Sequence, residues 1–307
     1  MHTPSEHTRP VLQSFDRVHG AFGPPEGESA PPHPGSRESP NALPPHAVAI
    51  KAKVTALRTT TAVYLAHAPR ASVRAGVRYR GATMTDPLSA LVEDGESLLF
   101  DGDYAGARRV FEQAVAEAKR THGERAKELI VPLMGLARAA GENNAAACDA
   151  MEAELEAQRR ALEIAEDALP SDDLLLAECL HAHGVSVWAS GEPTRAVELL
   201  LRALGVVRSA RSDAHGYLGP LVGALLDAQR THEALPHARE LLDLEDASSP
   251  PDLTTLFLVG QCFRQAGANE DARAVFQRFL VAFGEDGNAT IRDEVKTYLE
   301  ALDAAPS

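Results

Sequence analysis

The sequence predicts an all-α fold built from repeated helical hairpins, and three observations support this prediction. Apolar residues recur at helical spacing in the stretch 256–279. The same spacing returns several times along the chain. Aromatic residues make up only 5% of the 307 residues, and β-branched residues form no run as long as a strand. Together these features favour helices packed on helices.

The stretch 256–279 predicts one hairpin. Its first apolar stripe has members at i, i+3, i+4 and i+7, namely Leu256, Val259, Gly260 and Phe263. Its second stripe consists of Ala272, Phe276 and Phe279, and the Gly-Ala-Asn run at 267–269 predicts a turn between the two helices. Gly260 and Ala272 are small enough to let the helices approach closely. Because a single hairpin of this kind cannot bury its apolar faces alone, we expect further copies.

Three such copies lie upstream. One consists of Leu91, Gly95, Leu98, Gly102, Tyr104, Ala107, Phe111 and Ala114. Another consists of Leu180, His183, Gly184, Val187, Trp188, Gly191, Ala196, Leu200 and Ala203. A weaker copy, without glycine in its turn, consists of Leu218, Leu221, Val222, Leu225, Ala234, Ala238 and Leu241. The alanines that follow the turns are at 107, 196, 234 and 272, so the first interval leaves room for one more unit.

This additional unit begins with a helix that contains Val131, Met134 and Gly135, and its second helix ends near Ala161. The small residue of the first helix lies 26 positions before the closing residue, compared with 19 in the three clear copies. Seven extra residues are about two helical turns, which return the buried face to nearly the same side. The sequence therefore predicts five hairpins, the second with a longer second helix.

The ends of the repeated region are marked by capping signals. Asp86 is expected to cap a helix that starts at Pro87. Later helices are expected to start similarly, at Leu174 after Ser171-Asp172-Asp173 and at Leu253 after Ser249-Pro250. Residues 288–302 predict one more amphipathic helix, which we expect to cover the last hairpin as a capping helix. Pro132, Pro220 and Pro236 fall inside expected helices, which are predicted to start late or to kink there.

Residues 1–83 differ from the rest and are expected to be a disordered segment, whereas 84–307 are expected to form the repeat domain. The segment holds 11 of the 20 prolines and 6 of the 12 histidines. From 46 to 83 it carries seven Lys or Arg residues and no Asp or Glu. Three interpretations stay open: a disordered basic tail, a targeting segment, and a translation start placed too early, with Met84 as the true start.

Charge and cysteine content limit the class of protein. Residues 1–83 have a net charge of +5 and residues 84–307 a net charge of −19, so the repeat region disfavours nucleic acid. The three cysteines, Cys148, Cys179 and Cys262, are scattered and odd in number, which indicates a reducing compartment. No apolar run approaches the roughly 20 residues of a membrane span. We therefore expect a soluble, cytoplasmic protein that does not bind membranes.

No pattern in the sequence predicts a catalytic or metal site. Cys179, His181 and His183 look like a cluster of ligands, but on a helix His181 points away from the other two. His232 and His237 are five residues apart and do not share a face, with Pro236 between them. The Glu- and Arg-rich stretch 151–166 is expected to be a solvated face with pairs such as Glu156–Arg160. We expect no enzyme, no metal and no cofactor.

The repeated pattern resembles the tetratricopeptide repeat (TPR), and the long spacing with phrases such as Arg-Arg-Ala-Leu-Glu-Ile is most similar to the kinesin-light-chain-like subgroup. The resemblance covers residues 88 to about 303. It implies a right-handed α-solenoid whose first helices line a concave, partner-binding groove. The groove residues it implies are Glu96, Phe100, Leu136, His181, Val185, Trp188, Asp227, Phe257, Gln261 and Arg264.

Two known ways of binding peptides in this family are not expected here. The Lys, Asn and Arg set that holds a C-terminal carboxylate is missing. The positions where kinesin-like members carry a peptide-binding Asn are Glu93, Leu133, Ala182, Pro220 and Leu258. The sequence thus predicts a non-catalytic protein–protein interaction scaffold with a protein or peptide partner. The alternative is a regulatory protein that senses a peptide and changes its curvature. Trp188 is either core packing or an anchor for the partner.

Overall fold

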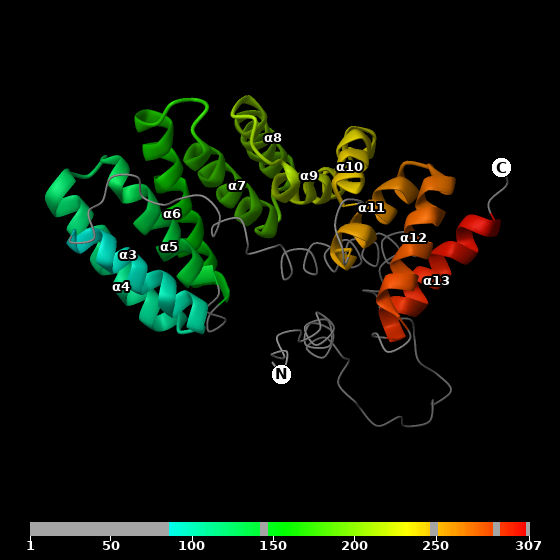
Figure 1. Cartoon of the computed structure of the whole chain (residues 1–307), viewed down its shortest axis with the longest axis horizontal. Helices are drawn as coiled ribbons and strands as arrows, with labels where there is room; N and C mark the ends of the chain where they lie inside the picture. Colours follow the sequence, from blue (N-terminus) through cyan, green and yellow to red (C-terminus); the bar gives the residue numbers. More distant parts are fainter. Residues whose placement is uncertain (1–85, 142–146, 246–250, 285–288, 305–307) are drawn as a thin grey trace, which may run out of the picture. The chain divides into compact units, whose positions relative to one another are not determined.

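The computed structural model of the chain describes residues 86–141, 147–245, 251–284 and 289–304. These residues form eleven α-helices and one short 3-10 helix, and no strand occurs within the described ranges (Figure 1). They fall into two compact units, one up to Leu244 and the other from Glu245 onward. The all-α prediction is confirmed. The predicted segment 1–83 lies outside the described residues.

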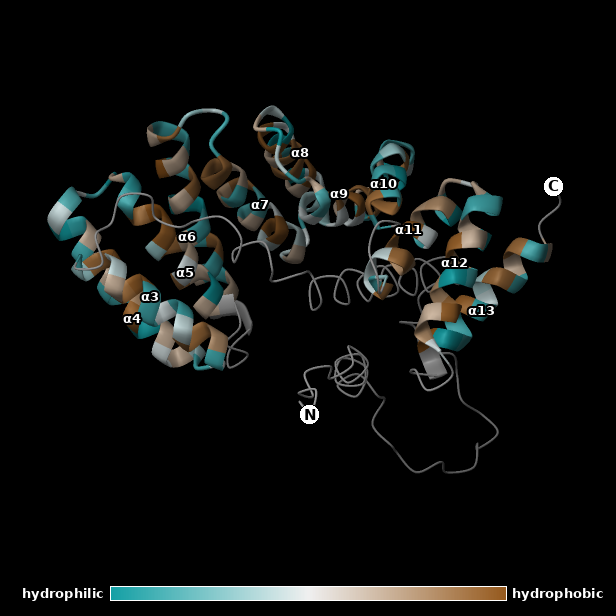
Figure 2. Ribbon diagram, viewed as in Figure 1, coloured by the Kyte–Doolittle hydropathy of each residue, from teal (hydrophilic) through white to brown (hydrophobic). Residues whose placement is uncertain are grey.

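The larger unit contains four consecutive helical hairpins. They are α3 (Pro87–Asp101) with α4 (Tyr104–His122), α5 (Ile130–Gly141) with α6 (Ala147–Ala168), α7 (Leu174–Ala189) with α8 (Pro193–Ser209), and α9 (His215–Asp227) with α10 (Thr231–Glu245). The 3-10 helix η2 (Lys127–Leu129) precedes α5. Each second helix from α4 to α8 also packs on the first helix of the next hairpin. Most helices carry both hydrophobic and hydrophilic residues, as expected of helices with one buried face (Figure 2).

The smaller unit contains the fifth hairpin and the capping helix. These are α11 (Leu253–Gln265), α12 (Asn269–Phe283) and α13 (Ala289–Ala304). The cap packs on α12 through buried Val295 and through the ring of Tyr298, whose centroid lies 5.6 Å from that of Phe276. An ion pair of 2.8 Å between Arg273 Nε and an Asp303 carboxylate oxygen joins the same two helices. The predicted capping helix is confirmed.

Glycine sets the register inside three of the hairpins. A Cβ atom added to Gly95, Gly184 or Gly260 would lie 2.7, 3.0 or 2.5 Å from the side chain 16 residues later in the chain. These side chains are Phe111, Leu200 and Phe276, all completely buried. The missing side chain of each glycine is thus the space that the large residue of the second helix fills.

The turns of these hairpins share one backbone geometry. Gly102, Gly191 and Gly267 have φ values of 80°, 92° and 76°, which an L residue rarely adopts. At Gly191, the following Glu192 N–H donates to the Val187 carbonyl at 3.2 Å, closing the helix as a Schellman motif. In the fourth hairpin Gln229 takes the same place with a φ of 60°. The fourth turn therefore keeps the geometry without the glycine.

The second hairpin differs from the prediction of two extra helical turns. Helix α6 is the longest of the described helices, with 22 residues. However, it begins 12 residues after Gly135, whereas α4, α8 and α12 begin nine residues after the equivalent glycine. Three of the seven extra residues therefore precede α6, and only four, about one turn, lengthen it.

Three helix starts test the capping predictions. Helix α3 begins at Pro87 as predicted, but Asp86 caps no backbone N–H and instead accepts a 3.4 Å hydrogen bond from the Ser89 hydroxyl. Asp173 caps α7 by accepting from the Leu175 N–H at 2.8 Å. The predicted start of α11 at Leu253 is confirmed, but the capping residue is Asp252, which accepts from the N–H groups of Thr254 and Thr255, and not the Ser249-Pro250 pair.

Two of the three prolines lie beyond the first helical turn. Pro132 is the third residue of α5, where its missing N–H would have no helical partner. Pro220 and Pro236 lie inside α9 and α10. Neither helix starts late, so that part of the prediction was wrong. The N–H that Pro220 lacks leaves the Gly216 carbonyl without its helical donor.

Candidate partner-binding surface

All ten predicted groove residues lie on first helices of their hairpins. Seven of them belong to the larger unit, where they come from α3, α5, α7 and α9. The other three belong to α11 in the smaller unit. The predicted residues therefore belong to two separate surfaces, one on each unit.

On α3 and α5 the predicted residues lie in three different environments. The Glu96 carboxylate forms an ion pair with Arg138 of α5, and both side chains are about one-third exposed. Phe100 is 74% exposed, the highest value of any large hydrophobic side chain on a described first helix. Leu136 is half-buried and packs against the cluster that contains Phe111. A charged pair and an exposed aromatic ring thus mark the beginning of this surface.

Trp188 is only 3% exposed, and it joins α7 to α9. Its indole Nε1 donates to an Asp227 carboxylate oxygen at 2.7 Å. A Cβ added to Gly223 would lie 2.3 Å from the ring, so the indole occupies the space that this glycine leaves. Of the two interpretations of Trp188, this burial favours packing between first helices over an exposed anchor. Asp227 serves as its hydrogen-bond acceptor.

His181 has a half-buried side chain that bridges to α9. Its ring meets that of Tyr217 edge-on, with 4.9 Å between the centroids. It also forms a hydrogen bond with the backbone of Gly216. Burial lowers the pKa of His181 to about 4, so the imidazole is neutral at physiological pH. Val185, one turn further along α7, is half-buried.

The neighbours of His181 in sequence face other surroundings. The Cys179 thiol lies 3.5 Å from the Met134 sulfur, and burial raises its pKa to about 12. His183 is 4% exposed, and burial lowers its pKa. Across the described ranges, no three His, Cys, Asp or Glu side chains gather as a metal site requires. These three residues therefore occupy three separate environments.

Glu178 is a polar residue of this surface that the sequence analysis missed. It lies three residues before His181, on the same face of α7, and it is half-buried. Burial raises the pKa of this carboxyl to about 7, although the charge of Arg138 acts in the opposite direction. Burial raises the pKa of Tyr217 to about 12, and the charge of Glu178 acts in the same direction. In the sequence, the three-residue spacing between Glu178 and His181 is the signal that could have placed Glu178 on this surface.

The three predicted residues of α11 pack within the smaller unit. Phe257 contacts Phe279, with 5.9 Å between the ring centroids. Gln261 is 4% exposed and accepts two hydrogen bonds from Arg264, at 3.1 and 2.8 Å. The Arg264 guanidinium also lies over the Tyr298 ring of α13, 4.6 Å from its centroid. The capping helix thus engages part of the surface that the resemblance implied for a partner.

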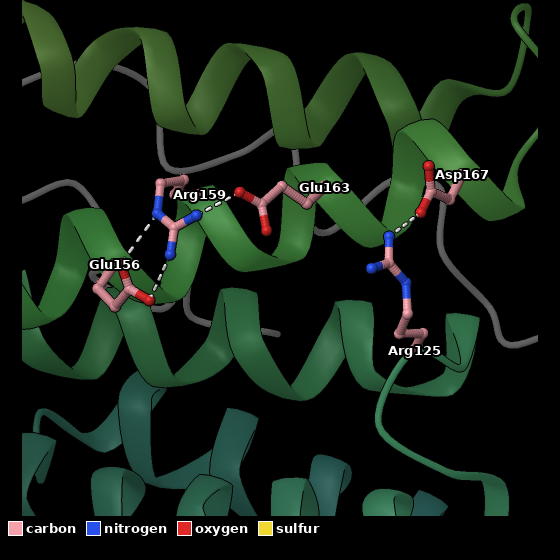
Figure 3. A network of polar contacts seen from close by, with 5 residues as sticks. All are labelled: Arg125, Glu156, Arg159, Glu163 and Asp167. Atoms are coloured by element: carbon pink, nitrogen blue, oxygen red, sulfur yellow. Dashed lines mark hydrogen bonds and ion pairs between the residues drawn. The ribbon is translucent and has the colours of Figure 1, made fainter.

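The Glu- and Arg-rich helix α6 carries a network of exposed ion pairs. Arg159 donates a hydrogen bond of 2.7 Å to Glu156 and also forms an ion pair with Glu163 (Figure 3). Arg125 forms an ion pair with Asp167. The predicted pair Glu156–Arg160 was wrong, because Arg160 instead bonds Glu124 at 2.5 Å. Such solvent-exposed pairs contribute about 0–1 kcal/mol each to stability.

The fold is that of a TPR protein, and comparison with solved structures agrees with the hairpins described above. A kinesin light chain of Podosopora anserina with nearly identical TPR-like repeats has 17% identity and a TM-score of 0.54. That match covers 64% of this chain and 93% of the other. BtubC (BKLC) of P. vanneervenii has 14% identity and a TM-score of 0.52, covering 84% and 94%. At these identities, the similarity shows the fold alone.

No protein-family profile and no curated protein sequence matches the chain. Within the described ranges, no helix has both the length and the apolar character that crossing a membrane requires.

Proposed function

We propose that this protein is a non-catalytic, cytoplasmic interaction scaffold whose first helices bind a protein or peptide partner. The observation that carries the proposal is the repeated hairpin array, in which the first helices of four hairpins supply half-buried polar side chains such as Glu96, Glu178 and Asp227. Helical repeats of this kind use extended surfaces for binding. The exposed ring of Phe100 is a suitable contact for an apolar group of the partner.

Affinity capture from the native cells, followed by mass spectrometry, tests this function. The bait is the full chain, compared with a Phe100→Ala variant of the first helix α3. The matched control is Val281→Ala, which removes an 84% exposed side chain from the second helix α12. We expect a partner that is retained by the wild type and the control and is depleted with Phe100→Ala. A partner captured equally by all three chains would argue against the first-helix surface.

The second candidate is a regulatory protein that senses a peptide and changes its curvature. The division of the described chain into two compact units is the observation that favours it, since a change of this kind requires parts that can move as bodies. Small-angle X-ray scattering with and without the captured peptide tests it. A radius of gyration that does not change on binding would exclude this candidate.

A further inference from the structure

We propose that the face of α7 that carries Glu178 and His181 binds an arginine or lysine side chain from a basic segment of a partner protein. This inference rests on the proposed function, because it states the chemistry of the partner that the first helices would bind. It depends on three features of the described residues: two acceptor groups on one helix face, a nearby aromatic ring, and the charge of the first helices.

The first acceptor is the Nε2 atom of His181. This atom is buried and has no hydrogen-bond partner among the described residues. The other ring nitrogen, Nδ1, is therefore the one that bonds the backbone of Gly216. Because Pro220 has no N–H, the Gly216 carbonyl lacks its usual helical donor and can accept a hydrogen bond from Nδ1–H. With its proton on Nδ1, the neutral ring presents Nε2 as an acceptor.

The second acceptor is the Glu178 carboxylate. Within the described part of the chain it makes no hydrogen bond and no ion pair, and it lies three residues from His181 on the same helix face. Arg138, whose charge lowers the pKa of Glu178, forms its ion pair with Glu96 and not with Glu178. The edge of this site is the ring of Tyr217, which touches His181. Two acceptors beside an aromatic ring suit an ammonium or guanidinium group, which carries only donors.

The charge of the first helices also favours a basic partner. Helices α3, α5, α7 and α9 contain six Asp or Glu residues and one Arg, which is Arg138. The second helices α4, α6, α8 and α10 contain 14 acidic and 10 basic residues, so their charges are mixed. A basic segment that approaches the first helices is therefore attracted along their length, and an acidic one is repelled.

The site predicts a specific dependence on pH. Burial raises the pKa of Glu178 to about 7, while the charge of Arg138 lowers it and that of Asp173 raises it. The Tyr217 phenol and the Cys179 thiol have pKa values of about 12, so both stay protonated near neutral pH, and His181 stays neutral. A cation binds the ionised carboxylate of Glu178 more tightly than the protonated carboxyl group. From pH 6 to pH 8 the affinity should therefore rise, up to about tenfold if only the carboxylate binds.

Selection from a displayed library of random dodecapeptides on the immobilised full chain tests the proposal. We expect enriched peptides to share an arginine or lysine at one position. One enriched peptide, labelled with fluorescein, should bind Glu178→Gln at least tenfold more weakly than the wild type. The matched control is Glu198→Gln on the exposed face of α8, which should bind as the wild type does. Replacing the peptide's arginine by citrulline should weaken binding to the wild type but have little effect on Glu178→Gln.

The outcomes separate this inference from the function on which it rests. Peptides that lose affinity with Phe100→Ala but carry no shared basic residue, or that bind Glu178→Gln normally, overturn the inference and leave the scaffold function intact. The absence of any enriched peptide overturns the inference, and the affinity capture described above then decides separately whether the scaffold function stands. Enriched sequences that match residues 46–83 would identify the occupant as this chain's own basic segment and overturn the assignment to a separate partner. Circular dichroism confirms that each variant is folded.

Discussion

Where three hairpins place a glycine, the fourth places Gln229, and its left-handed φ of 60° shows that the turn geometry is imposed by the surrounding hydrogen bonds. The Arg230 N–H donates to the Leu225 carbonyl at 2.8 Å, and the Gln229 N–H to the Leu226 carbonyl at 3.0 Å. These bonds hold a conformation that costs an L residue about 1 kcal/mol or more. A single residue can thus break the repeat pattern while the backbone keeps it.

Replacing Gln229 with glycine should therefore raise the free energy of unfolding by about 1 kcal/mol, because glycine removes the strain of the left-handed conformation. The measurement is urea unfolding monitored by circular dichroism. Gln229→Ala is the matched control, since it shortens the side chain but keeps Cβ, and it should change stability little. Gly191→Ala should lower stability by about 1 kcal/mol. Equal stabilities for Gln229→Gly and Gln229→Ala would show that the left-handed conformation at position 229 is not strained.

Glu178 gives a second prediction at this scale, through the effect of pH on stability. Its pKa is about 7 in the folded chain and near the ordinary 4.5 when unfolded, so the folded state binds the proton more tightly. This contribution to stability is present at low pH and is lost as pH rises from 4.5 through 7. Glu178→Gln should consequently come close to the wild-type thermal midpoint at pH 4, below the unfolded pKa, and exceed it at pH 8. A constant difference between the two chains over this range would contradict a raised pKa.

The candidate site shows how far single residues can be predicted from the sequence. His181 was found because it flanks a packing position of its hairpin. Glu178 was missed because the groups that interact with it, Arg138 of α5 and Tyr217 of α9, lie about 40 residues away in the chain on either side. The Glu96–Arg138 pair joins residues 42 apart for the same reason. Helical periodicity describes one helix, whereas these contacts depend on how neighbouring hairpins stack.

At the scale of the helix, apolar spacing and small residues were sufficient to predict the hairpins. The predicted contact of Gly260 with the second helix is confirmed, because the Phe276 ring fills the space beside it. The length of α6 was overestimated because spacing between packing residues does not distinguish helix from connection. The fourth hairpin was predicted less clearly, since its close contact lies between Gly223 and Trp188 of the preceding first helix.

Two glycine substitutions separate packing from helix propensity. Gly260→Leu should destabilise the chain by about 1–3 kcal/mol, because even a Cβ atom would lie 2.5 Å from the Phe276 ring. Gly205→Ala is the control in the interior of α8, where an added Cβ would meet nothing within 4 Å. It should stabilise by about 0.5–1 kcal/mol through helix propensity. Thermal midpoints that move in the same direction for both would show that close contact does not set the register.

At the scale of the whole molecule, the all-α class, the number of hairpins and the capping helix were all predictable, because each hairpin repeats one local pattern. The division into two compact units was not predicted. The described residues on either side of positions 246–250 continue the same hairpin pattern, so periodicity alone gives no sign of a boundary there. Because of this division, seven of the predicted groove residues belong to the larger unit and three to the smaller one.

The role of residues 1–83 stays a prediction that truncation can test. A chain that begins at Met84 should show the same helical signal per molecule and the same thermal midpoint as the full chain, because the five hairpins and the cap lie after this position. Circular dichroism during heating provides both values. Loss of cooperative unfolding on truncation would instead make the segment part of the fold. Tryptic peptides from residues 1–80 in native extract would exclude Met84 as the start.

Hydrogen–deuterium exchange of the full chain, with and without the captured partner, tests the first-helix surface most directly. Backbone amides of a helix that contacts a partner exchange more slowly, and the peptides from α5, α7 and α9 can be compared with those from α6, α8 and α10. We predict that the partner slows exchange in the first helices and leaves the second helices of the same hairpins unchanged. Protection confined to the second helices would contradict the proposed binding surface.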